Sequence, residues 1–162
     1  MNNFDANDII RKLEEDLSIY KEVTNQYEQI MNKQIKILNN TIEKYLPIMK
    51  WYIENNIVFK YPDLRLKSEI GPILGYNEKE DKLIVYYYEK RATVKVKTTT
   101  TRRIIEIYSP WNLIRDGFFL DALSGLKYLE IGYSLSIHKL KELMSSYKKD
   151  INQIEKQLHT DN

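Results

Sequence analysis

The sequence predicts an α+β fold, in which two long terminal helices form an antiparallel, coiled-coil-like pair around a small antiparallel β-sheet. From Tyr133 to Leu158, apolar side chains recur at alternating steps of three and four residues. Such a heptad stripe lies along one face of a helix and needs a partner helix to cover it. The N-terminal third carries a similar stripe, and the middle of the chain is rich in β-branched and aromatic residues, which favour strands.

We expect residues 1–162 to form a single domain with three regions. Residues 1–56 supply the long N-terminal helix and a short helix, residues 57–109 supply the antiparallel β region, and residues 110–162 supply a short helix and the long C-terminal helix. A chain of this length buries about two-thirds of its unfolded surface on folding, which is enough for a real core.

The N-terminal helix is predicted to begin near Asp5 to Asp8, whose side chains suit an N-cap. Apolar positions then follow, mostly three or four residues apart, as far as Tyr45. Pro47 lacks an amide hydrogen and its ring clashes with the preceding helical turn. We therefore expect a break at Leu46, followed by a short helix over residues 47–54.

The middle region is predicted to hold four or five antiparallel strands, with the charged turn at 77–81 joining two of them as a hairpin. Val94 and Val96 alternate with Lys95 and Lys97, which predicts a strand with one face in solvent. Six segments are candidates for these four or five strands, namely residues 57–61, 64–70, 73–76, 82–88, 92–97 and 103–108.

The C-terminal region begins with the cleanest local signal in the chain. Ser109 followed by Pro110 is typical of an N-cap and the first position of a helix. Gly117 and Gly125 indicate helix ends nearby. The long final helix is predicted over residues 126–158, with Gly132 inside it at a cost of about 1 kcal/mol relative to Ala.

Composition excludes several classes of chemistry. The chain has no Cys, so it has no disulfide, thiol nucleophile or Cys-based metal site, and we expect a cytoplasmic location. No apolar run approaches the roughly 20 residues that span a bilayer, and the first residues do not resemble a signal peptide. The net charge is +2, distributed as −2 over residues 1–56, +4 over 57–109 and 0 over 110–162. The β region is therefore the basic part of the chain.

Catalytic and metal-binding motifs are missing from the sequence. It contains no HExxH, GxSxG, P-loop or GxGxxG pattern. His138 lies four residues from Glu142, so the two could share a helix face and contribute two metal ligands, but an exposed pair is the favoured interpretation. We predict no catalytic residues, no metal and no cofactor, and we expect that the protein is not an enzyme.

The strongest candidate for binding is a basic stretch with a Thr run at residues 98–101. Cations and hydroxyls together suit phosphate oxygens, and neighbouring tyrosines could stack on bases, as in proteins that bind single-stranded nucleic acids. An acidic protein surface would suit the same patch, and a solvated sheet face is the alternative without function. The predicted partner- or phosphate-binding residues are Lys90, Arg91, Lys95, Lys97, Arg102, Arg103, Tyr86 and Tyr88.

The two heptad stripes are the second candidate for binding. The N-terminal stripe is longer than its C-terminal counterpart, so part of it should stay uncovered by the pairing and invite another chain. We therefore expect self-association. The predicted helix-pair or oligomer seam consists of Leu13, Leu17, Tyr20, Tyr27, Leu38, Ile137, Leu140, Met144, Tyr147, Ile151 and Ile154.

These observations lead to two functional hypotheses. The first is a non-enzymatic protein-interaction module with another protein as its partner, a larger enzyme or complex, and with a homodimer as a further expectation. The abundance of Ile, Lys and Asn suggests an AT-rich gene. One version of this hypothesis is therefore a phage or mobile-element inhibitor that blocks a host defence or nucleic-acid enzyme by binding it. The alternative is a protein that binds nucleic acid or nucleotides through the basic Thr-rich region. No membrane partner is expected.

Overall fold

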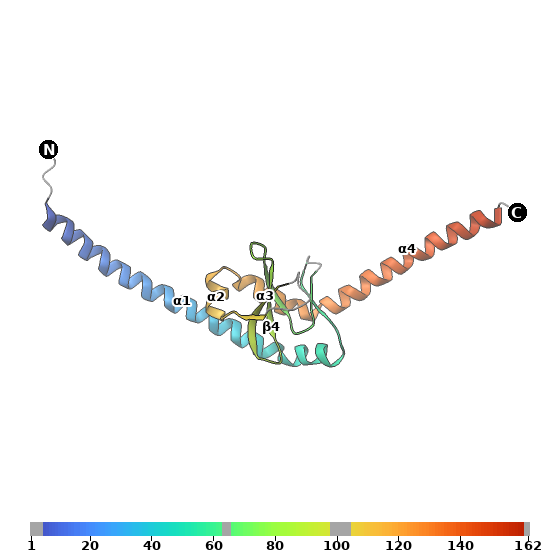
Figure 1. Cartoon of the computed structure of the whole chain (residues 1–162), viewed down its shortest axis with the longest axis horizontal. Helices are drawn as coiled ribbons and strands as arrows, with labels where there is room; N and C mark the ends of the chain where they lie inside the picture. Colours follow the sequence, from blue (N-terminus) through green and yellow to red (C-terminus); the bar gives the residue numbers. More distant parts are fainter. Residues whose placement is uncertain (1–4, 63–65, 98–104, 161–162) are drawn as a thin grey trace.

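The computed structural model describes residues 5–62, 66–97 and 105–160, and it confirms the α+β fold class with a long helix at each end. Helices α1 (Ala6–Glu54) and α4 (Gly132–Thr160) project on opposite sides of a small globular body (Figure 1). We call residues 6–30 the N-terminal arm, α4 the C-terminal arm, and the described residues between them the head. The head contains β1 (Phe59–Lys60), β2 (Lys67–Ser68), β3 (Ile73–Asn77), β4 (Lys82–Tyr87), β5 (Ala92–Lys97), β6 (Ile105–Ile107), α2 (Pro110–Arg115), α3 (Phe119–Lys127) and the 3-10 turn η1 (Tyr128–Glu130).

Helix α1 is continuous across its 49 residues, so the predicted break at Leu46 is wrong. The Asp5 carboxylate caps the first turn by accepting a hydrogen bond from the Asn7 amide at 2.9 Å. Pro47 lies inside the helix with its ring exposed. The turns after it pack Met49 and Tyr52 into the core, and this burial holds the helical path despite the lost backbone hydrogen bond.

The sheet is a four-stranded antiparallel meander in the order β3-β4-β5-β6, and β1 and β2 form a separate two-stranded ribbon. The predicted hairpin around residues 77–81 is confirmed, with Asp81 in the left-handed region at φ 50°. The strand predicted over residues 64–70 is reduced to Lys67–Ser68, and that over residues 103–108 to Ile105–Ile107 within the described chain.

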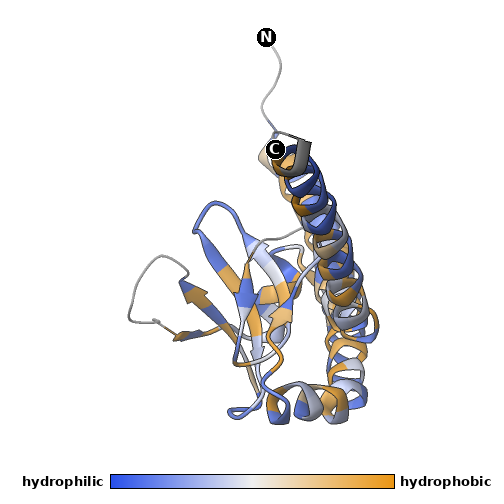
Figure 2. Cartoon of the chain, turned by 90° about the vertical axis from the view of Figure 1, so that its right-hand side faces the viewer, coloured by the Kyte–Doolittle hydropathy of each residue, from blue (hydrophilic) through white to orange (hydrophobic). Residues whose placement is uncertain are grey.

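Both faces of the meander are covered. Ile84 and Tyr86 of β4 point toward the helices, where they pack against Leu38 of α1 and its neighbours in α2 and α3. Figure 2 shows the sheet lying beside the helices. The other face carries a smaller apolar cluster, in which Val85 and Val94 lie opposite each other on paired strands. The head therefore has its own core, independent of the two arms.

The C-terminal half begins as predicted, because the Ser109 hydroxyl accepts a hydrogen bond from the Asn112 amide at 3.2 Å and Pro110 opens α2. The single helix predicted over residues 126–158 is instead divided. Helix α3 ends at Lys127, and α4 begins only at Gly132. A Cβ atom at Gly132 would lie 2.7 Å from Cε1 of Tyr128, so a larger residue at this position would have to displace the Tyr128 ring.

The predicted pairing of the two terminal helices does not occur within the chain. Over the described residues, α1 packs against α2 and α3, while α4 makes its main contacts with η1. The two arms diverge from the head (Figure 1). The physical reason is that the core-facing stripe of α1 is occupied by the head from Met31 onward, and η1 then directs α4 away from it. No helix in the described ranges is both long and apolar enough to cross a bilayer.

Candidate interaction site

The outer part of the N-terminal arm carries an apolar stripe that no other part of the described chain covers. The stripe of α1 is buried where it crosses the head, at Met31 and Leu38. Head coverage begins at Tyr27, whose ring meets Trp111 of α2 edge to face, with centroids 6.5 Å apart. Farther out, the apolar residues of the stripe are exposed, namely Ile10, Leu13, Leu17 and Tyr20.

The C-terminal arm carries the second uncovered stripe along its full length. Leu140, for example, is 61 % exposed. The predicted seam residues are therefore exposed in the single chain, except Leu38, which belongs to the core of the head. An apolar stripe this long costs free energy in water, and it is typical of a surface that another polypeptide covers. The exposed seam residues of α4 are Ile137, Leu140, Met144, Tyr147, Ile151 and Ile154.

The two arms differ in charge. Residues 6–30 hold six acidic and three basic side chains, for a net charge of −3. Residues 132–160 hold three acidic and five basic side chains, for a net charge of +2 with histidine neutral. The N-terminal and C-terminal arms are therefore complementary in charge. Two copies of the same arm would repel each other weakly.

The base of α4 is tied to α1 by polar and aromatic contacts. The Tyr52 hydroxyl donates to the Leu129 carbonyl at 2.8 Å, and the Tyr45 hydroxyl donates to the Glu130 carboxylate. The hydrogen bond to Glu130, together with burial, raises the pKa of Tyr45 to about 12. Trp51 meets Tyr133 edge to face at 6.1 Å. These contacts fix where the C-terminal arm leaves the head.

The predicted basic patch is only partly assembled. Lys90 and Arg91 are exposed in the β4–β5 turn, and each lies over a tyrosine ring: Lys90 Nζ is 5.4 Å from the Tyr87 centroid, and Arg91 Cζ is 4.5 Å from that of Tyr88. Lys97 is half-buried at the far end of β5. Arg102 and Arg103 lie outside the described residues.

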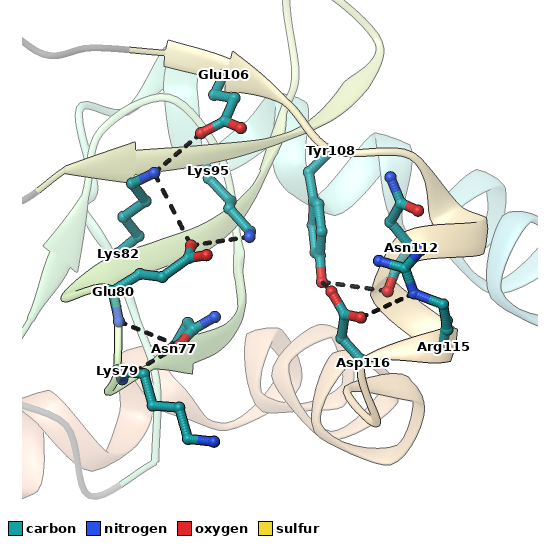
Figure 3. Close-up of polar contacts among 10 residues, drawn as sticks. All are labelled: Asn77, Lys79, Glu80, Lys82, Lys95, Glu106, Tyr108, Asn112, Arg115 and Asp116. Carbon is teal, nitrogen blue, oxygen red and sulfur yellow. Dashed lines mark hydrogen bonds and ion pairs between the residues drawn. The ribbon is translucent and has the colours of Figure 1, made fainter.

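Lys95 is not on a solvated face, contrary to the prediction. Its side chain points to the helix side of the sheet, and the residue is only 7 % exposed. Its ammonium donates to Glu80 at 2.9 Å and lies 4.3 Å from the Tyr108 ring centroid (Figure 3). This ion pair lowers the pKa of Glu80. A phosphate would therefore have to displace Glu80 in order to reach Lys95.

The same network continues on both sides. Lys82 donates to Glu106 at 3.0 Å, while the Tyr108 hydroxyl donates to Asp116 at 2.5 Å (Figure 3). Burial, followed by the hydrogen bond to Asp116, raises the pKa of Tyr108 far above its ordinary value, so its hydroxyl stays protonated. The network joins the β3–β4 turn, β6 and α2, which is a structural role.

The surface of the head is hollowed beside α1 and at the base of α4. A groove of about 800 Å³ runs between α1 and the sheet, and its lining includes Tyr86, Arg91 and Glu43. Burial raises the pKa of Tyr86, and the neighbouring Arg91 acts in the opposite direction. A smaller pocket of about 280 Å³ lies at the base of α4 beside Tyr133 and Lys60. In the smaller pocket the Lys60 ammonium donates to the Ser136 hydroxyl at 3.0 Å.

The His138–Glu142 pair is found on the surface of α4, with Nε2 and Oε1 3.2 Å apart. Within the described ranges, no three His, Asp or Glu side chains gather closely enough to hold a metal ion. Both side chains of the pair are exposed, as the favoured interpretation of the sequence expects.

Comparison with protein-family models, curated proteins and solved structures finds no match to this chain.

Sequence reasoning missed several residues that widen the exposed stripes. They flank the heptad positions, and a search for a second apolar residue next to each heptad position would have found them. Trp51 also extends the stripe of α4 onto the head through its contact with Tyr133. The additional exposed apolar residues of the arms are Ile9, Ile19, Leu135 and Leu143.

Proposed function

We propose that this protein is a non-enzymatic interaction module, whose two helical arms bind other helices through their apolar stripes. One observation carries the proposal: the stripe that is buried at Leu38 continues outward as exposed leucines and tyrosines, and α4 repeats the pattern on the other side of the head. Helices with an apolar seam associate when a second helix fills the spaces between the seam residues.

The head supports this role by separating the arms. Its core is complete without them, and the contacts of Tyr45 and Tyr52 with the segment before α4 hold the base of the C-terminal arm. Inhibition of a host enzyme by a phage or mobile-element protein stays a narrower prediction within this class. Binding of nucleic acid stays the alternative, now centred on Lys90 and Arg91.

The test compares full-length variants that place a charge on a stripe or beside it. Leu17→Asp and Leu140→Asp disrupt the two stripes, while Ser18→Asp and Ser145→Asp add the same charge at exposed positions off the stripes. Tagged proteins are used to capture partners from cells of the natural source, and the captured chains are quantified by mass spectrometry, with copies of this chain counted among them.

We expect the stripe variants to lose most of the bound protein and the off-stripe variants to retain it. Circular dichroism at low protein concentration checks that every variant is folded. If the stripe variants capture the same proteins in the same amounts as the wild type, the arms are not the binding surface and the proposal is wrong.

A further inference from the structure

We propose that the occupant of both stripes is a second copy of this chain. In this dimer the N-terminal arm of each copy packs antiparallel against the C-terminal arm of the other. The inference rests on the proposed function, because it names the helix that each arm binds. Four features of the chain favour this arrangement: the register of the stripes, the lengths of the arms, their charge and the directions in which they leave the head.

The two stripes match in antiparallel register. Both follow steps of three and four, so one alignment places every seam residue of the N-terminal arm opposite a seam residue of the C-terminal arm, with Thr24 the one polar member. A slip of one heptad would leave an apolar layer at one end without a partner. The facing pairs are Ile10 with Ile154, Leu13 with Ile151, Leu17 with Tyr147, Tyr20 with Met144, Thr24 with Leu140, and Tyr27 with Ile137.

The lengths of the arms also match. Residues 6–30 form a helix of roughly 37 Å and the 29 residues of α4 one of roughly 43 Å, at 1.5 Å per residue. Neither arm would leave a long uncovered end.

Charge favours pairing between unlike arms. Two N-terminal arms would bring together two helices of net charge −3, and two C-terminal arms would bring together two of net charge +2. An N-terminal arm against a C-terminal arm combines opposite signs instead. Such complementarity selects the partner more than it adds affinity.

The directions of the arms allow both pairs to form at once. The N-terminal arm runs toward the head and the C-terminal arm runs away from it, on opposite sides (Figure 1). A second copy can be related to the first by a rotation of 180° that exchanges the two sides of the head. This rotation places each arm against the unlike arm of the other copy, in antiparallel orientation. The result is a closed twofold dimer, in which both interfaces are the same and no stripe is left for a third copy.

The experiment uses spin labels on the full chain, which has no native Cys. One preparation carries Ser18→Cys on the N-terminal arm, and another carries Ser146→Cys on the C-terminal arm. In the proposed register these two positions lie at the same level along the paired helices, and both lie off the stripes. The labelled proteins are mixed in equal amounts, and pulsed electron paramagnetic resonance measures the distances between labels.

We expect a distance within about 25 Å in the mixture, since the axes of packed helices lie about 10 Å apart. Neither preparation alone should give this distance, because like arms stay apart in the dimer. Sedimentation should give twice the 19.4 kDa mass of one chain. Adding Leu17→Asp to both preparations should abolish the short distance and halve the mass, whereas Ser145→Asp should change neither.

Three results would overturn the proposal. A short distance within the Ser18→Cys preparation alone would show that like arms pair. A mass that grows beyond two chains would show an open assembly. A monomeric mass at high concentration would show that copies do not pair. If monomers still capture another protein through their stripes, the proposed function stands while the dimer is wrong.

Discussion

Leu17 and Leu38 lie on the same stripe of α1, yet Leu38 is completely buried and Leu17 is 51 % exposed. The head covers one half of the stripe and leaves the other half in solvent. At protein concentrations low enough for the chain to be monomeric, we expect Leu38→Ala to lower the free energy of unfolding by about 2–5 kcal/mol, because it leaves a cavity in the core. Leu17→Ala should change it by less than about 0.5 kcal/mol.

Urea denaturation followed by circular dichroism measures both changes. Repeating it at high protein concentration should enlarge the effect of Leu17→Ala, because a dimer gains stability by mass action and Leu17 would then be covered. Equal losses for the two variants at low concentration would mean that the N-terminal arm is covered within one chain.

The Glu80–Lys95 pair should make stability depend on pH. The hydrogen bond from Lys95 holds the pKa of Glu80 below its ordinary value of 4.5. The folded chain therefore binds this proton less tightly than the unfolded chain does, so the pair stabilises the fold above pH 4.5, and the stabilisation is lost as the pH falls through the lowered pKa. Glu80→Gln should lower the melting temperature at pH 7 and weaken the acid-induced decrease.

Melting temperatures of wild type and variant from pH 7 down to pH 3 measure this difference. Glu78→Gln, at an exposed position in the same turn, is the matched control and should follow the wild type. If the melting temperatures of wild type and Glu80→Gln fall in parallel as the pH is lowered, the Glu80–Lys95 pair contributes nothing to the loss of stability in acid.

Local patterns in the sequence predicted the elements better than they predicted what covers them. The heptad steps identify both long helices, but a stripe has the same period whether its partner is the same chain or another. Leu38 and Leu17 therefore look alike in sequence and differ in burial. The alternation around Lys95 assigned its side chain to the correct face, but that face is covered by Tyr108 and Glu80, which come from distant segments.

Breaks in the helices were harder to predict, because they depend on packing. Pro47 predicts a break that the burial of Met49 and Tyr52 prevents. Gly132 looked like an interior residue, whereas it is the first residue of α4 and lies beside the Tyr128 ring. In both cases tertiary contacts override local preference.

The basic residues give a test of the nucleic-acid alternative. If phosphate binding occurs, replacing Lys90 and Arg91 by Ala should weaken it and reduce its dependence on salt, because fewer counterions are released. Replacing Arg102 and Arg103 by Ala should do the same. Gel-shift titrations with short DNA and RNA at two salt concentrations measure both, and no shift by the wild type at low salt would remove this alternative.

Tyr45 and Glu130 should control stability at alkaline pH. The hydrogen bond to Glu130 and partial burial raise the pKa of Tyr45 from 10.0 to about 12, so the folded chain holds this proton more tightly than the unfolded chain. The stabilisation is complete below pH 10 and is lost as the pH rises to about 12. Tyr45→Phe should therefore melt at a lower temperature than wild type at pH 8, and the difference should shrink as the pH rises toward 12.

Glu130→Gln should also lower the pKa of Tyr45, measured by ultraviolet titration. Because each substitution removes the same hydrogen bond between Tyr45 and Glu130, the double variant should be scarcely less stable than either single variant. Fully additive losses would show that the two side chains stabilise the base of α4 independently.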